Sequence, residues 1–332
     1  MGSVNFGLWY DFRNPGPNAP PFEAFYANAL AQIESAEALG FDSVWLTEHH
    51  FCADGYTPSP LVLAGAIAAR TRRLRIGTNL VILPVHDPVR IAEDAATLAI
   101  VSGGRFDLGV AIGYRELEFA AFGRSLRHRP GLMEEAIAVI RRAWSGAPLD
   151  FAGRHFNYGS VNVTPKPART PRLLIGGMSE PAIDRAVRLG DGFLSTGGIG
   201  HDLYAAALAR HGRDPATLPI FAGHWAIISP DPAAEAERIG RHVLYQANEY
   251  IRWGAFGPPD TTPLFPDAKT ALAQGLYELW DADTAVAKLS ELIETWPSVA
   301  DIHFWAQFPG EPVESGQRRI EYIAERVLPR LR

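Results

Sequence analysis

One pattern runs through most of the chain: a short, apolar, strand-like segment followed by a longer segment with helical spacing. The unit occurs eight times, with expected strands at residues 4–10, 41–47, 74–83, 106–112, 172–175, 192–195, 220–228 and 300–306. Such alternation indicates an α/β fold whose parallel strands are joined by helical crossovers. Eight units are typical of a (β/α)8 TIM barrel, which usually takes about 250 residues plus insertions. We therefore predict one barrel domain, residues 1–332.

Helical spacing of apolar residues predicts helices at 22–39, 60–71, 88–101, 130–145, 181–189, 203–210, 232–253, 271–279, 284–296 and 317–331. Two irregular stretches are expected to be insertions: 147–171, after the fourth strand and its helix, and 254–268, after the seventh strand. A doubly wound open sheet would also alternate strands and helices. However, the first turn, 11–21, is rich in Pro and Asn and lacks the GxGxxG pattern of those folds, so the barrel is preferred.

Composition excludes several classes of function. The net charge of −6 and the absence of a Lys/Arg run argue against nucleic acid as a partner. No apolar run approaches the ~20 residues that span a membrane, and the N-terminus has no signal-peptide pattern. The single cysteine, Cys52, rules out an intrachain disulfide and fits a reducing compartment. We therefore expect a cytoplasmic protein.

Three consecutive ionisable residues, Glu48, His49 and His50, stand where the second strand should end. Active sites of barrels are built at the carboxyl ends of the strands, which favours a functional role over a hydrogen-bonded scaffold histidine. Successive residues of an extended segment point to opposite faces, so His49 should share a face with Trp45 and Thr47. Glu48 and His50 should share the other face, so only one histidine is expected to line a given cavity.

The turn after the fifth strand, Gly177, Met178 and Ser179 preceded by a further glycine, has the composition of a phosphate cradle. Glycines allow a close approach of the backbone, and Ser179 could cap a helix whose free N–H groups attract an anion. The alternative is an ordinary tight turn with a serine N-cap.

A metal site is not expected. Metal-dependent barrel enzymes typically carry two histidines separated by one residue on a strand, so that both side chains point inward. In this chain His49 and His50 are adjacent. The other histidines, His86 among them, are scattered singly. Covalent acyl chemistry is not expected either, because the chain has no GxSxG motif.

Three segments resemble the bacterial luciferase-like flavin monooxygenases: GFDSVWLTEHHF at 40–51, RIGTNLVILPVHDPVRIAEDAATLAIVSGGRFDLGVAIGYRELEFAAFG at 75–123, and PRLLIGGMSEPAIDRAVRLGDGFL at 171–194. The resemblance implies a barrel, usually a homodimer, that takes reduced FMN from a separate flavin reductase. The reduced FMN reacts with O2, and the resulting C4a-peroxyflavin oxygenates a small organic substrate. Trp9, Tyr10, Phe51 and Tyr114 favour an apolar or cyclic substrate, unless these rings serve only for packing.

The resemblance also implies roles for individual residues. His49 matches the active-site histidine, an acid/base at neutral pH, and Glu48 and His50 flank and support it. Asn79 and Leu80 match the position of a cis non-proline peptide against the flavin ring. The remaining cofactor-binding residues that it implies are Gly113, Tyr114 and Arg115 after the fourth strand, and Gly177, Met178 and Ser179 at the flavin phosphate.

Two departures from bacterial luciferase bear on this expectation. Ile112 stands where that enzyme has a phosphate-binding arginine, and Ala111 where it has a reactive cysteine. Either Arg115 replaces the missing charge or the helix after the fifth strand holds the phosphate. The related F420-dependent oxidoreductases, which transfer hydride, remain an alternative, as does a flavin-binding protein without catalysis. Substrate, type of oxygenation and reductase are left open.

Overall fold

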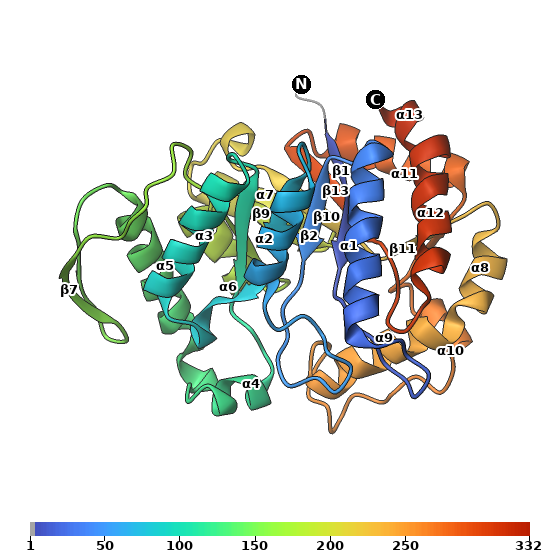
Figure 1. The fold of residues 1–332 in the computed structure, drawn as a ribbon, viewed down its shortest axis with the longest axis horizontal. Helices are drawn as coiled ribbons and strands as arrows, with labels where there is room; N and C mark the ends of the chain where they lie inside the picture. The colour runs from blue at the N-terminus through green and yellow to red at the C-terminus, as the bar shows by residue number, and fades with distance from the viewer. Residues whose placement is uncertain (1–3) are drawn as a thin grey trace.

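The computed structural model describes residues 4–332, so the first three residues of the predicted domain lie outside the described residues. The strands form a closed parallel barrel with helices between them, as predicted (Figure 1). The barrel strands are β1 (Asn5–Tyr10), β2 (Ser43–Leu46), β3 (Arg75–Thr78), β4 (Val81–Ile82), β5 (Phe106–Ala111), β8 (Leu173–Gly176), β9 (Phe193–Thr196), β10 (Ile220–His224) and β13 (Val299–Trp305).

Pairing between β3 and β5 closes the sheet, whose order is β3-β2-β1-β13-β10-β9-β8-β5-β4. Within residues 4–332 these nine strands occupy eight positions, because β3 and β4 are two halves of one expected strand. The halves lie on either side of the Asn79–Leu80 peptide, which is cis. The expected strand at 74–83 is therefore interrupted.

The helices that cover the barrel bury an aliphatic layer against the strands. Their bounds are α1 (Phe22–Ala38), α2 (Pro60–Arg70), α3 (Pro88–Val101), α4 (Glu116–Ala121), α5 (Arg129–Trp144), α6 (Glu180–Leu189), α7 (His201–Arg210), α8 (Pro232–Arg238), α9 (Gly240–Trp253), α10 (Ala268–Ala273), α11 (Ala282–Thr295), α12 (Val313–Arg326) and α13 (Leu328–Leu331). No helix in this part of the chain combines the length and apolar character needed to cross a membrane.

Aromatic and polar side chains fill the barrel interior. Trp9 stacks on Trp305 with ring centroids 4.3 Å apart, and Trp45 stacks on His303 at 4.9 Å. Asp301 lies 3.0 Å from Nδ1 of His303 and accepts a 2.9 Å bond from the Trp45 indole. The Asp301–His303–Trp45 group is thus hydrogen-bonded, whereas the indole N–H of Trp305 has no acceptor among residues 4–332.

Both predicted insertions are present, but the second is much longer than the predicted 254–268. The first is an antiparallel hairpin of β6 (Leu149–Ala152) and β7 (Asn157–Val161) after α5. The second follows β10 and contains β11 (Ala226–Ile228), α8, α9, α10 and β12 (Glu278–Trp280). In Figure 1, α4 and α9 lie at the end of the barrel opposite to the chain termini.

Three sequence predictions around the second insertion are wrong in detail. The expected strand 220–228 breaks at Trp225, where the chain leaves the barrel as β11. The expected helix 271–279 is replaced by the end of α10 and by β12, which pairs in parallel with β11. The expected helix 232–253 is interrupted at Ile239. Pairing of β11 with β12 is a tertiary interaction that outweighs local helix preference.

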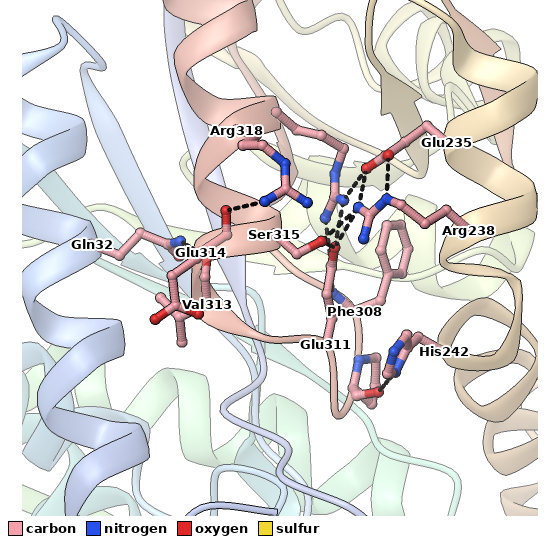
Figure 2. Close-up of polar contacts among 12 residues, drawn as sticks. Gln32, Glu235, Arg238, His242, Phe308, Glu311, Val313, Glu314, Ser315 and Arg318 are labelled. Carbon is pink, nitrogen blue, oxygen red and sulfur yellow. Dashed lines mark hydrogen bonds and ion pairs between the residues drawn. The ribbon is translucent and has the colours of Figure 1, made fainter.

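A buried ionic network fastens this insertion to the last helix of the barrel. Figure 2 shows Glu235 and Arg238 of α8 facing Glu311, which follows β13, and Ser315 of α12. Arg319 donates two 2.6 Å bonds to Glu311 and one 2.7 Å bond to Glu235. The network thereby holds α8, and α9 directly after it, in place over the barrel.

Replacing Glu311 with alanine is expected to lower the free energy of unfolding by about 3–5 kcal/mol, because it leaves the guanidinium of Arg319 buried without its main partner. The matched control is Asp94→Ala, which removes the exposed pair with Arg90 and should cost less than about 1 kcal/mol. Urea unfolding of both variants measures the difference. Equal losses would contradict the role given to the network.

Candidate active site

The three ionisable residues after β2 lie at the carboxyl end of the barrel and are buried: Glu48 is 4% exposed, and His49 and His50 are 7% exposed. The strand ends at Leu46, so the residues that follow form an extended loop. Their side chains separate into two environments. His49 contacts residues of the loop and helix after β5, whereas Glu48 and His50 contact each other and His86. The predicted division of the two histidines between opposite faces is confirmed.

The imidazole of His49 lies between a carboxylate and a phenol. Its Nδ1 is 2.8 Å from Oε1 of Glu118, and its Nε2 is 3.0 Å from the hydroxyl of Tyr114. Burial raises the pKa of Tyr114 well above its ordinary value, so the phenol keeps its proton and donates to Nε2. The neutral imidazole therefore carries its proton on Nδ1 and donates it to Glu118.

Glu118 is the functional candidate that sequence reasoning missed. It is 0% exposed, and its Oε1 also accepts a 2.8 Å bond from the backbone N–H of His50. Its Oε2 has no partner among residues 4–332. The residue lies on α4, a short helix that was not predicted. The available signal was Phe122, four residues later, which puts the carboxylate on the same helix face as an aromatic ring.

Glu48 joins His50 to His86, a histidine that stands singly in the sequence. Its Oε1 lies 2.8 Å from Nε2 of His86 and 3.2 Å from Nε2 of His50, and its Oε2 accepts from the N–H of Ile82. Neither Glu48 nor His50 bonds the His49 ring, whose partners are Glu118 and Tyr114. The expected support of His49 by Glu48 and His50 is therefore not made through side-chain bonds.

This cluster has metal-ligand chemistry, since the ligand atoms of Glu48, His50 and His86 lie within 4.8 Å of one another. In this structure the carboxylate instead accepts hydrogen bonds from both rings. Burial disfavours the ionised carboxylate, but the positive charge of His86 and the bonds from both histidines outweigh it and lower the pKa of Glu48 to about 2. Glu48 in turn raises the pKa of His86, against the effect of burial. The expectation that no metal is bound stays a prediction, which elemental analysis checks.

These shifts predict how stability depends on pH. The depressed pKa of Glu48 contributes stability above its ordinary value of 4.5, and this is lost as pH falls toward about 2. The raised pKa of His86 contributes stability below 6.5 that is lost as pH rises through the folded value. The melting temperature of the native protein should therefore exceed that of Glu48→Gln by more at pH 5.5 than at pH 8.5. A difference in melting temperature between the two proteins that is equal at both pH values, or larger at pH 8.5, would contradict this prediction.

Aromatic rings surround the outer side of His49. The ring centroids of Tyr56, Trp253 and Tyr250 lie 4.8, 5.1 and 6.3 Å from that of His49. Trp253 and Tyr250 belong to α9, so the second insertion forms this side of the site. A cavity of about 520 Å³ lies beyond, and Trp253 and Tyr114 form part of its wall. The rings exclude water from His49 on this side.

Other predicted aromatic residues are placed differently. Trp9 belongs to the barrel interior, and the hydroxyl of Tyr10 donates to Gln32 of α1, outside the barrel. Phe51 is 56% exposed and packs near Phe122. Of the four residues expected to shape a substrate pocket, Tyr114 is the one that bonds His49.

The residues expected to bind the flavin ring and phosphate separate. Leu80, just before β4, lies against the end of β8, whereas Nδ2 of Asn79 lies 2.9 Å from Nε2 of His303 in the barrel interior. The side chain of Leu80 lies over Gly176, where an added Cβ would be 2.4 Å from Leu80 Cδ2. At Gly177 a Cβ would be 2.5 Å from Ala182. Ser179 is the N-cap residue of α6 but makes no side-chain cap bond, and Met178 is 47% exposed. The turn therefore allows a ligand to approach its backbone closely, and it places the free hydroxyl of Ser179 at a helix N-terminus. Both features suit the binding of a phosphate.

The loop after β5 connects this region to His49. Gly113 has φ +72°, and an added Cβ would lie 2.6 Å from the Ile82 side chain, so a glycine is needed there. Ala111 and Ile112 leave this strand end without a cation or a thiol.

Arg115 lies at the His49 end of the loop. It donates to the carbonyl of His50 and, at 3.3 Å, to the Cys52 sulfur, and it lies 3.7 Å from Glu118. Its guanidinium also stacks over the ring of Trp253 at 5.1 Å. Burial raises the pKa of Cys52 to about 12, so this thiol stays protonated, as expected for a packed cysteine.

A model of the luciferase-like monooxygenase family matches residues 4–287. Among solved structures, the monooxygenase RslO1 from Streptomyces bottropensis superposes with a TM-score of 0.82 at 25% identity, covering 98% of this chain and 99% of that chain.

Curated relatives include an F420-dependent dehydrogenase and a monooxygenase. The F420-dependent glucose-6-phosphate dehydrogenase of Kineococcus radiotolerans is 33% identical over 197 residues, which are 56% of this chain and 57% of that protein. The alkanal monooxygenase alpha chain of Photorhabdus luminescens is 34% identical over 130 residues, 39% of this chain and 36% of that protein. The chain thus matches about half or less of the length of these relatives.

Proposed function

The chain belongs to the luciferase-like monooxygenase family, and on that premise we propose that it is a two-component flavin-dependent monooxygenase. It would use reduced FMN and O2 to oxygenate a small organic substrate, with the reduced FMN supplied by a separate flavin reductase. The observation that carries the proposal is the Glu118–His49–Tyr114 arrangement at the carboxyl end of the barrel, where the turn at 176–179 also follows its strand. The likeness to the monooxygenase RslO1 over 98% of the chain supports it.

The residues present fit a flavin mononucleotide. Leu80 and the backbone of Gly176 and Gly177 would hold the ring system and the start of the ribityl chain, while Ser179 and the N-terminus of α6 would hold the phosphate. Because Ile112 provides no cation, the helix terminus and hydroxyl would carry most of the phosphate binding. A bound reduced flavin supplies two electrons to oxygen.

His49 is the residue that would hold and move a proton in the reaction. In its neutral form it accepts from Tyr114 at Nε2 and donates from Nδ1 to Glu118. A proton added at Nε2 therefore creates an imidazolium beside a carboxylate, which is the arrangement of an efficient acid/base. The surrounding rings keep bulk water from this proton. Glu118 touches His49 and acts through it, so it is a positioning residue.

The main alternative is an F420-dependent oxidoreductase that transfers hydride. The 33% identity to an F420-dependent dehydrogenase supports it, and the same His49 would then serve as the acid/base. A flavin-binding protein without catalysis is a second alternative. The buried Glu118–His49 pair speaks against it, because a paired, buried acid/base has no purpose in ligand storage.

Titration of the purified protein with FMN, reduced FMN and F420 tests the proposal, followed by addition of O2. We expect reduced FMN to bind more tightly than F420 and oxygen to be consumed when reduced FMN is present. Binding of F420 with no oxygen consumption by the complex with reduced FMN would overturn the proposal in favour of hydride transfer. Tight flavin binding without oxygen consumption or substrate turnover would favour the non-catalytic alternative.

We also propose a homodimer in the cytoplasm. Exposed apolar side chains on neighbouring helices support a dimer: Val62 on α2 is 74% exposed, and Ile100 and Val101 on α3 are 45% and 56% exposed. Sedimentation of the native protein and of Val62→Glu measures the oligomeric state. A monomeric native protein would overturn this part of the proposal.

A further inference from the structure

Arg13, in the loop after β1, is a fully buried cation whose hydrogen bonds are incomplete. Its exposed fraction is 0%, and its Nε donates a 2.6 Å bond to Asp54. The terminal nitrogens Nη1 and Nη2 have no acceptor among residues 4–332. A buried donor without an acceptor costs about 1–3 kcal/mol, and more when it is charged. Such a group calls for an explanation beyond packing.

Aromatic rings, which provide no hydrogen-bond acceptor of normal strength, enclose the guanidinium. Its Cζ lies 4.8 Å from the ring centroid of Trp253, 5.1 Å from that of Tyr245 and 5.2 Å from that of Tyr56. Cation–π attraction offsets part of the cost of burial. The four N–H bonds at the end of the guanidinium still point among these rings without a partner.

The same rings enclose His49. The centroids of Tyr56 and Trp253 lie 4.8 and 5.1 Å from that of His49, so Arg13 and His49 lie around shared aromatic side chains. Trp253 also forms part of the wall of the cavity of about 520 Å³. The side chain of Trp253 therefore lies between that cavity and the buried guanidinium of Arg13.

The positive charge of Arg13 is balanced, but its hydrogen bonds are not complete. The carboxylate of Asp54 balances the positive charge of Arg13 through its bond to Nε. It also accepts a hydrogen bond from the hydroxyl of Tyr245. Asp11 lies nearby, but burial raises the pKa of its carboxyl to about 7, so at neutral pH it is only partly ionised. A group with two acceptor oxygens would therefore complete the hydrogen bonds at the free end of Arg13.

We propose that Arg13 binds the carboxylate of an aromatic or cyclic substrate, whose ring lies among Tyr56, Tyr250 and Trp253 within reach of His49. The planar end of the guanidinium matches a carboxylate with two parallel N–H···O bonds. The aromatic rings match an aromatic or alicyclic body. Entry requires Trp253 to move toward the cavity that it borders. The proposal rests on the proposed function only in taking the surroundings of His49 as the substrate site.

Calorimetric titration of the flavin-free, full-length protein with benzoate, and with benzamide as its neutral isostere, tests this proposal. We expect benzoate to bind at least tenfold more tightly than benzamide, a difference typical of one charge-assisted, two-point contact. Benzoate that binds no more tightly than benzamide would overturn the proposal, and this comparison needs no variant.

Variants of Arg13 locate the contact. Arg13→Gln and Arg13→Lys should each weaken benzoate binding at least tenfold, since glutamine lacks the charge and lysine lacks the planar pair of donors. The double variant Arg13→Gln, Asp54→Asn leaves no unpaired Asp54 carboxylate in the interior. If Arg13→Gln alone unfolds, benzoate binding by the double variant is compared with that of the native protein instead. The control is Arg252→Gln, an exposed arginine of the same cavity, which should bind benzoate as the native protein does. Benzoate affinity that is unchanged in folded Arg13 variants would assign Arg13 to structure alone.

Failure of this inference and failure of the proposed function are distinguishable, because benzoate binding is measured without flavin or oxygen. Benzoate binding through Arg13 in a protein that consumes no oxygen with reduced FMN would refute the function and keep the carboxylate site. Oxygen consumption with reduced FMN in a protein that binds benzoate no more tightly than benzamide would keep the proposed function and refute the carboxylate site.

Discussion

Replacing His49 with alanine is expected to lower the turnover number by about 10²–10⁴-fold, the usual contribution of a positioned acid/base. His49 is the ring that joins Glu118 and Tyr114, and alanine leaves no group there that exchanges a proton near neutral pH. Affinity for FMN should be unchanged, because the residues that would hold the flavin come from β4, β8 and α6. The expectation holds for oxygenation and for hydride transfer.

Substrate-dependent oxygen consumption with reduced FMN measures the turnover, and fluorescence titration measures FMN affinity. His128→Ala is the control, because His128 is exposed and makes no contact with this site. A His49→Ala variant that retains native turnover would remove His49 from the chemistry. Loss of both turnover and FMN binding would instead indicate damage to the fold, which circular dichroism would reveal.

Replacing Glu118 with glutamine is expected to lower the turnover number by about 10² or more. In serine proteases the equivalent carboxylate-to-amide change beside the catalytic histidine costs about 10⁴ because it favours the wrong tautomer. Glutamine at 118 keeps the size of the side chain but loses the charge that accepts from His49 Nδ1 and from the N–H of His50. The Michaelis constant for reduced FMN should stay constant, because Glu118 acts through His49.

A double variant separates positioning from a general loss of structure. Once His49 is alanine, adding Glu118→Gln should cause little further loss of turnover, because residues that act as a unit are not additive. Glu118→Asp should recover part of the activity, since it restores the charge. The control is Glu116→Gln, two residues earlier on the same helix and exposed. Additive losses in the double variant would contradict the role of Glu118 as the positioning partner of His49.

Much of the fold could be predicted because the signals are local. Apolar alternation and helical spacing are properties of single segments, and eight such units leave few topologies other than a closed barrel. The predictions that failed lie in the second insertion, where β11 and β12 are held by pairing across more than 40 residues of chain. The residues 271–279 have helical spacing, and only the neighbouring strand turns their end into β12.

The candidate site could be predicted in part. Residues 48–50 stand at a strand end, and the period of two for extended chain correctly separated His49 from His50. The resemblance implied the cis peptide at Asn79–Leu80, which the structure confirms. Glu118 was not singled out, because a glutamate one turn before an aromatic residue is ordinary until its burial is known.

The sequence by itself determined the barrel, because the alternation of strand-like and helix-like segments is a property of neighbouring residues. It also predicted the end of the barrel at which the candidate site lies, and the resemblance predicted His49 as its acid/base. Only the tertiary structure decided what those residues touch. It joined Glu118 to His49 across 69 positions, His86 to Glu48 across 38, and Trp253 of the second insertion to Arg13 of the first loop. Contacts between distant segments depend on how helices and loops pack over the strands, and no local pattern records that packing.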